Sequence, residues 1–238
     1  MLPAITHPAV WLGNQLGNVT SPSVPSGFAE LDAELPGRGW PTAALTEILP
    51  QHEGIGELRI LGPALAALAR EGRMLVWIAP PHLPYPPALA AAGIGLARFL
   101  VVRTRSPRET LWATEQALRS NACGAVLAWP GSSKYAELRR LQLATAGNPV
   151  LAVLFRPPQV ACESTPAALR LGLETCNGDL AVRILKRRGA ARAQPILLRP
   201  AVIVHRANRR PCFDSHVVDC NRSPRPAARS VPAHISFR

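Results

Sequence analysis

The stretch Leu45-Thr-Glu-Ile-Leu-Pro-Gln-His-Glu-Gly-Ile-Gly-Glu-Leu58 is the most informative part of this sequence. It predicts a strand over 45–49, then a turn that contains Gly54 and Gly56, then a helical run. The apolar residues of that run are spaced three and four apart, and a kink or restart is expected at Gly62-Pro63. This order of elements aims backbone N–H groups at phosphate in many nucleotide-binding proteins. The stretch therefore indicates an α/β fold with a turn that resembles a phosphate loop.

As a phosphate loop, however, this turn is degenerate. A working loop carries a lysine that neutralises the phosphates and a hydroxyl group that holds Mg²⁺. Here the lysine position falls on Gly56 or on Glu57, depending on where one gap is placed. A carboxylate at that position would repel a phosphate. Glu53 and Glu57 are interpreted instead as capping residues of the following helix. The sequence predicts no cofactor and argues against ATP binding.

Strands and helices alternate through the rest of the chain. Continuous apolar runs predict buried strands over 73–79, 99–102, 125–129 and 150–155. Helices are expected at 28–32, 88–92, 107–119 and 135–145, and Ser106-Pro-Arg-Glu109 is a strong helix start. Residues 169–174 and 180–185 are expected to pair as antiparallel strands around Asn177-Gly178. This rhythm predicts an α/β fold with a mostly parallel, doubly wound sheet.

Composition divides the chain into three parts. We expect an extended N-terminal arm over 1–26, a core domain over 27–189 and a basic, largely disordered tail over 190–238. Residues 186–238 hold twelve basic and two acidic residues, whereas the rest of the chain is nearly neutral. Within the tail, 195–199 and 201–204 suggest strands, and 221–238 should be disordered. The positive charge is therefore concentrated at the C-terminal end.

The sequence favours a cytoplasmic protein with reduced cysteines. Residues 74–97 are uncharged, but five prolines interrupt them, so no membrane span is expected. The five cysteines contain no C-x-x-C pair. A zinc set of His205, Cys212, His216 and Cys220 matches no common spacing, so no metal site is predicted.

The other groups that nucleotide hydrolysis requires are also missing. An aspartate for the metal ion would follow the strand at 125–129, and a water-orienting glutamate would follow the strand at 73–79. The chain has Ala128-Trp-Pro130 and Ala79-Pro-Pro-His82 at these places. His82 could act as a replacement base, but a structural histidine in a loop is the simpler interpretation. We predict a protein with no catalytic residues, not an enzyme.

Two basic groups are candidate contacts for a partner or for DNA. Arg139 and Arg140 are adjacent on the helix at 135–145, where a merely solvated face is the alternative. Lys186, Arg187 and Arg188 form a compact cluster at the end of a strand. Such clusters attract phosphate or acidic protein surfaces without distinguishing between them.

Ordered blocks across residues 10–190 resemble the ImuA family. Among them are Ser26-Gly-Phe-Ala-Glu-Leu-Asp32, Leu45-Thr-Glu-Ile-Leu49, Trp77-Ile-Ala-Pro-Pro-His82, Leu111-Trp-Ala-Thr-Glu-Gln-Ala-Leu118, Leu138-Arg-Arg-Leu-Gln-Leu-Ala144 and Leu185-Lys-Arg-Arg-Gly189. That family is similar to RecA in fold and, in its middle portion, to the SulA cell-division inhibitors. The resemblance implies a RecA-like sheet with a degenerate phosphate loop at Gly54, Gly56 and Glu57.

The same resemblance implies a non-catalytic role in the SOS-induced mutasome, which carries out error-prone translesion DNA synthesis. The partners implied are an ImuB-like polymerase-related protein and an error-prone replicative-type DNA polymerase, with RecA and single-stranded DNA as further candidates. Two alternatives stay open: a SulA-like inhibitor that acts on FtsZ, and a DNA-stimulated ATPase with displaced catalytic residues.

Overall fold

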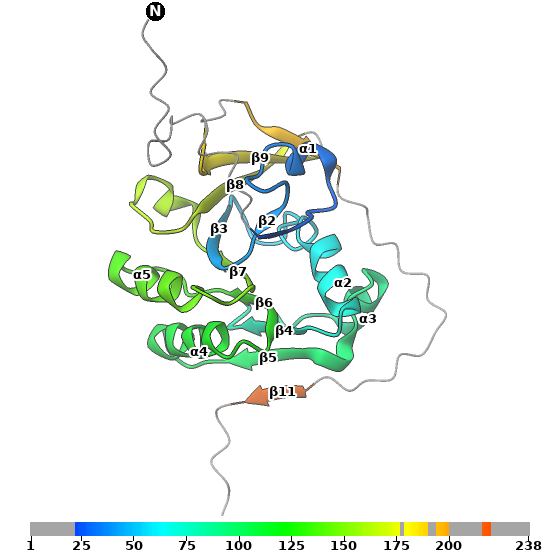
Figure 1. Cartoon of the computed structure of the whole chain (residues 1–238), viewed down its shortest axis with the longest axis vertical. Coiled ribbons are helices and arrows are strands. Elements are labelled where there is room, and N and C mark those ends of the chain that lie inside the picture. Colours follow the sequence, from blue (N-terminus) through cyan, green and yellow to red (C-terminus); the bar gives the residue numbers. More distant parts are fainter. Residues whose placement is uncertain (1–21, 177–178, 190–193, 200–215, 220–238) are drawn as a thin grey trace, which may run out of the picture.

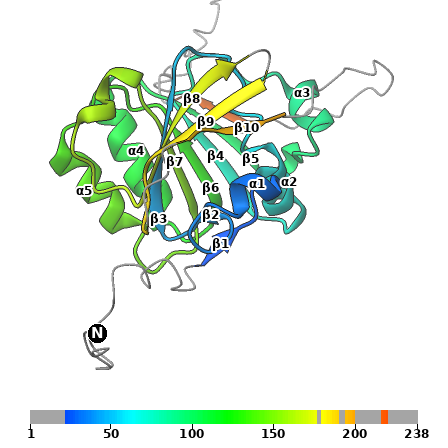
Figure 2. The same cartoon turned by 90° about the horizontal axis from the view of Figure 1, so that it is seen from above.

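The computed structural model describes residues 22–176, 179–189, 194–199 and 216–219, with backbone structure only for the last of these ranges. In this part of the chain, nine strands form one sheet and two short strands form another, with helices on both faces of the large sheet (Figures 1 and 2). The strands of the large sheet are β3 (Ala44–Pro50), β4 (Met74–Ile78), β5 (Phe99–Arg103), β6 (Cys123–Ala128), β7 (Leu151–Phe155), β8 (Leu169–Cys176), β9 (Asp179–Lys186), β10 (Ile196–Leu198) and β11 (His216–Asp219).

The order of these strands is β10-β9-β8-β3-β7-β6-β4-β5-β11. The seven strands β8, β3, β7, β6, β4, β5 and β11, which are neighbours in this order, all run parallel. At the other end of the sheet, β8 pairs with β9 and β9 pairs with β10 in antiparallel register. The predicted mixed α/β fold with a mostly parallel sheet is confirmed. The predicted antiparallel pair is also confirmed as β8 and β9, although its turn at 177–178 lies outside the described residues.

Two helical layers bury the two faces of the sheet. On one face lie α2 (Gly62–Arg70) and α3 (Pro86–Ala91), together with the short helix α1 (Ala29–Asp32). On the other face α4 (Pro107–Arg119) and α5 (Tyr135–Ala144) lie side by side, as Figure 2 shows. Two 3₁₀ turns, η2 (Leu96–Arg98) and η3 (Pro158–Cys162), connect strands. Each layer has its own apolar cluster, so β6 and β7 are buried on both faces.

Two helix starts show how local sequence sets the boundaries. α4 begins as predicted, because the Ser106 side chain accepts a hydrogen bond from the Glu109 N–H (3.3 Å) and Pro107 occupies the first turn. α2 begins only at Gly62, with Pro63 in its first turn. The expected restart at Gly62-Pro63 is therefore confirmed, and Leu58 lies in the turn before the helix.

The sheet system extends past both expected ends of the core. β1 (Ser23–Val24) pairs with β2 (Trp40–Pro41), although residues 1–26 were expected to form an arm. β10 matches the strand expected at 195–199 and lies beyond residue 189, as does β11, which the sequence did not predict. Residues 1–21, 201–204 and 221–238 lie outside the described residues. No helix that the structure describes is long and apolar enough to cross a membrane.

Candidate functional site

The glycine turn (residues 51–61) lies between β3 and α2. Gly54 and Gly56 both have positive φ angles, +80° and +112°, which favour glycine because it lacks a Cβ. Their N–H groups converge on one anion, the Glu57 carboxylate. Gly54 donates to Oε1 at 3.0 Å and Gly56 to Oε2 at 3.1 Å. The turn therefore binds its own carboxylate through the backbone groups that a phosphate loop would offer to a ligand.

This geometry corrects the expected role of the two glutamates. Glu57 is five residues before the first residue of α2, so it bonds the turn and does not cap the helix. It is 9% exposed. Glu53 is exposed and lies 3.5 Å from His82, measured from Oε2 to Nε2. His82 is also exposed, with 83% of its side chain open to solvent, so it is a solvated residue of the loop after β4.

A cavity of about 530 Å³ opens beside the glycine turn, at the carboxyl ends of the parallel strands. Ligands of open α/β sheets usually bind at this edge. One wall consists of Trp129 and Phe155, whose rings stack with centroids 4.6 Å apart. The remaining lining residues come from the turn and from proline-rich loops: Pro50, Gln51, His52, Glu53, Glu57, Ala79, Pro81, Gly131, Arg156, Pro157, Pro158 and Gln159.

A nucleotide-hydrolysing site needs a lysine in the turn, a glutamate after one strand and an aspartate after another, and this chain has other residues at all three positions. Glu57 stands near the expected lysine position, Ala79 follows β4, and Trp129 follows β6. All three line the cavity, so the sheet brings these positions together. What they present is a carboxylate, a methyl group and an aromatic ring. Among the described residues, no group of three His, Cys, Asp or Glu side chains could hold a metal ion.

Below the cavity lies a buried ionic network that the sequence analysis missed. Glu47, in the middle of β3, is wholly buried between two arginines. Its Oε1 is 3.1 Å from Arg156 Nη1 and its Oε2 is 2.6 Å from Arg170 Nε. Arg156 Nη2 is also 3.3 Å from Glu163 Oε2, so two positive and two negative charges balance.

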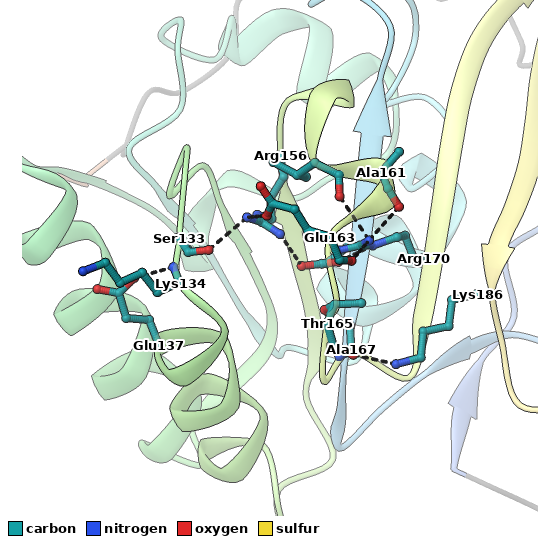
Figure 3. Close-up of polar contacts among 12 residues, drawn as sticks. Ser133, Lys134, Glu137, Arg156, Ala161, Glu163, Thr165, Ala167, Arg170 and Lys186 are labelled. Atoms are coloured by element: carbon teal, nitrogen blue, oxygen red, sulfur yellow. Dashed lines mark hydrogen bonds and ion pairs between the residues drawn. The ribbon is translucent and has the colours of Figure 1, made fainter.

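Backbone carbonyls accept further hydrogen bonds in this network and link two connections, the one between β6 and α5 and the one between β7 and β8. Arg156 donates to the Ser133 carbonyl, and Arg170 donates to the carbonyls of Ala161 and Glu163, as Figure 3 shows. The signal in the sequence is a glutamate inside the apolar run at 45–49, where an unpaired charge would be costly. Its arginine partners lie 109 and 123 residues away, so spacing could not reveal them.

The predicted basic contacts divide into engaged and open side chains. Lys186 Nζ donates to the Thr165 carbonyl at 2.6 Å, and Arg187 pairs with Glu34 at 2.9 Å. Arg188 is exposed. On α5, Arg140 pairs with Glu115 of α4, and Arg139 is exposed. The structure thus places the two groups on different elements and leaves their role in binding a prediction.

One cysteine has a shifted acidity. Burial raises the pKa of the Cys123 thiol above its ordinary value of 9.0, while a hydrogen bond from Ser120 and the charge of Arg73 partly oppose the shift. Cys162 and Cys176 are exposed free thiols. Cys123 is at the start of β6, away from the strand ends that line the cavity. Its chemistry is therefore not part of the candidate site.

Comparison with known proteins identifies the relatives of this chain. The family model described as cell division inhibitor SulA matches residues 45–151, from the start of β3 to the start of β7. Over this region the chain is related to the SulA proteins, and ImuA proteins are among its relatives. The cell division inhibitor SulA of Edwardsiella piscicida is 31% identical over 111 residues, which cover 46% of this chain and 66% of the relative.

The ImuA match extends slightly further along this chain. Protein ImuA of Caulobacter vibrioides strain NA1000 / CB15N is 30% identical over 129 residues, which cover 52% of this chain and 53% of the relative. SulA of Photorhabdus laumondii is 30% identical over 115 residues, or 48% of this chain and 65% of the relative. The chain thus spans between about half and two thirds of these curated relatives. The resemblance to the ImuA family is confirmed.

Proposed function

We propose that this chain is a non-catalytic accessory protein of SOS-induced, error-prone translesion DNA synthesis. In this role it docks an ImuB-like polymerase-related protein and an error-prone replicative-type DNA polymerase at damaged DNA, with RecA and single-stranded DNA as further partners. The relation to ImuA and to SulA supports a role in the SOS response. The proposal includes a RecA-like origin of the sheet and the interpretation of residues 51–61 as a degenerate phosphate loop.

The observation that carries the non-catalytic part is the Glu57 carboxylate in the glycine turn. It already accepts the N–H groups of Gly54 and Gly56, and a second anion placed there would meet a like charge a few ångströms away. If the Glu57 side chain moved out of the turn to make room for a phosphate, the N–H groups of Gly54 and Gly56 would lose their acceptor, and the negative charge of Glu57 would still lie close to the negative ligand. ATP binding is therefore disfavoured twice, by occupancy and by charge.

A genetic experiment tests the role in mutagenesis. Deleting the gene for this chain should lower the frequency of mutations induced by ultraviolet light, and plasmid expression of the intact chain should restore it. The affinity-tagged chain should also retain an ImuB-like protein from the same cells. Normal induced mutagenesis in the deletion strain would refute the proposal. A tagged chain without residues 190–238 would show whether the C-terminal region contributes to that capture.

The second candidate is a cell-division inhibitor, as the SulA name of two relatives and the matched family model suggest. Its target would be FtsZ. Overexpression should then produce filamentous cells, and the purified chain should lower the GTPase rate of FtsZ. The accessory role predicts normal cell length under the same induction. This comparison separates the two functions in one strain.

The basic cluster Lys186, Arg187 and Arg188 has a smaller part in the proposal. Two of its side chains already bond within the protein, to the Thr165 carbonyl and to Glu34, whereas Arg188 is exposed. We therefore assign any contact with DNA or partner at this cluster chiefly to Arg188. Arg188→Gln should weaken binding of single-stranded DNA and leave the melting temperature unchanged, because Arg188 is exposed. Arg187→Gln should lower the melting temperature, because it breaks the pair with Glu34. Equal DNA affinity for Arg188→Gln and the parent chain would remove this assignment.

A further inference from the structure

A separate hollow of the surface is a groove between α4 and α5, on the helical layer away from α2 and α3. It has a volume of about 600 Å³. Its lining includes Arg108, Leu111 and Trp112 of α4 and Arg140 and Leu141 of α5, with Glu115 between the two helices. We term these six residues the α4/α5 groove. None of them belongs to the glycine turn or to the cavity beside it.

An exposed tryptophan marks this groove. Trp112 is 62% exposed even though it lies on a helix whose inner side packs against the sheet. Tyr135 and Leu143 of α5 are exposed as well, at 48% and 62%. Tryptophan and arginine are the residue types that dominate binding energy in protein interfaces. Leu141 is buried, so an apolar side chain of a partner would meet a preformed apolar floor beside the indole ring.

The groove lining holds two arginines, Arg108 and Arg140, and two glutamates, Glu115 and Glu137, and both carboxylates bond within the protein. Glu115 is 8% exposed and pairs with Arg119 Nη2 at 2.8 Å and with Arg140 Nη2, so its charge is neutralised within the protein. Both arginines nevertheless remain more than 60% exposed. A guanidinium has five N–H donors, and these contacts engage the Nη2 group of each. Arg119 and Arg140, together with the exposed Arg108, can therefore bind further carboxylates.

The distribution of these charges separates a protein partner from a nucleic acid. Glu137 lines the groove beside Arg140, and Glu109 lies one residue beyond Arg108 on α4. Their carboxylates bond the backbone N–H groups of Lys134 and Arg105, which fixes them in place. A continuous row of phosphates in the groove would pass close to the Glu137 carboxylate that lines it, whereas isolated acidic side chains of a peptide can contact the arginines alone.

We propose that the α4/α5 groove is a docking site for an acidic segment of a protein partner, with a bulky apolar residue that packs against Trp112. The carboxylates of the segment bind Arg108 and Arg140, and its apolar residue covers Leu111 and Leu141. This assignment rests on the proposed accessory function only for the identity of the partner. The surface and its chemistry apply equally to a SulA-like role.

Selection from a random 16-residue peptide library displayed on phage tests the assignment with the full chain as bait. The enriched peptides should combine acidic residues with Trp, Phe or Leu. The affinity of the strongest peptide should fall at least about tenfold for Trp112→Ala, as expected for an interface hot spot. It should fall severalfold for Arg108→Gln. Arg98→Gln, an exposed arginine on η2 outside the groove, should leave the affinity unchanged.

Three outcomes would overturn the proposal. Peptides could enrich without acidic residues, peptides could bind Trp112→Ala as tightly as the parent chain, or no peptide could enrich at all. A second experiment uses an oligothymidylate of about 20 nucleotides. If it binds and Trp112→Ala abolishes that binding, the groove belongs to single-stranded nucleic acid. Because Trp112 is exposed, the variant should keep its melting temperature, and Arg108→Gln provides a second test if it does not. Normal mutagenesis in the deletion strain would refute the proposed function and leave this result intact.

Discussion

Replacing Glu47 with glutamine should destabilise the fold by about 3 kcal/mol, at the lower end of the range for breaking a buried ion pair. Glu47 is wholly buried, and its two carboxylate oxygens contact Arg156 at 3.1 Å and Arg170 at 2.6 Å. Glutamine preserves the volume and one acceptor oxygen but removes the negative charge. Glu163 would then be the remaining carboxylate in the network, and its side chain is 54% exposed, so solvent weakens its compensation.

Urea denaturation followed by tryptophan fluorescence measures this loss. Folded domains have a total stability of about 5–15 kcal/mol, so a change of about 3 kcal/mol shifts the midpoint clearly while the slope stays constant. The matched control is Glu174→Gln, which breaks an exposed pair with Arg183 at 3.8 Å, both side chains being 51% exposed. It should cost less than about 1 kcal/mol. Equal losses for the two variants would refute the claim that the fold depends on the charge of the buried Glu47.

Three further predictions test other parts of the structure. Ser106→Ala should cost about 1 kcal/mol in urea denaturation, because the α4 N-cap hydrogen bond is lost, and an unchanged midpoint would contradict this. Gly39→Ala should lower the melting temperature, since an added Cβ would lie 2.4 Å from the Val24 carbonyl oxygen, and a variant as stable as the parent would show that the loop relaxes freely. Iodoacetamide at pH 8 should modify the exposed Cys162 well before the buried Cys123, which mass spectrometry can follow. The free energy of unfolding should fall as the pH rises above 9.0, because the unfolded chain then releases the Cys123 proton more readily than the folded chain, and denaturation at a series of pH values measures this loss.

Much of the sheet follows from short-range sequence patterns. The apolar runs that predict strands at 99–102 and 150–155 correspond to β5 and β7 within one residue at either end. β7 is buried along its whole length, as a central parallel strand is expected to be, whereas buried and partly exposed residues alternate along β5. The start of α4 is set by three local features, a capping serine, a proline in the first turn and a glutamate at the third position. Such elements are encoded within a few residues.

Other features depend on contacts between distant segments, which the sequence does not reveal. The partners of Glu47 lie more than a hundred residues away, and β1 pairs with β2 across the connection formed by residues 25–39. For Glu57, the sequence shows that a carboxylate replaces the lysine. It does not show that this carboxylate bonds the two glycine N–H groups, because that depends on the φ angles of the turn. The fold was therefore more predictable than the chemistry of the site.

Calorimetric titration with ATP and Mg²⁺, with and without single-stranded DNA, shows whether the glycine turn can bind nucleotide. Because Glu57 occupies the turn, we expect no saturable heat up to about 1 mM nucleotide, the dissociation constant that corresponds to a binding free energy of about 4 kcal/mol. Saturable binding below that concentration, lost in Gly56→Ala but retained in Arg98→Gln, would place nucleotide in the turn and contradict the proposed occupancy by Glu57.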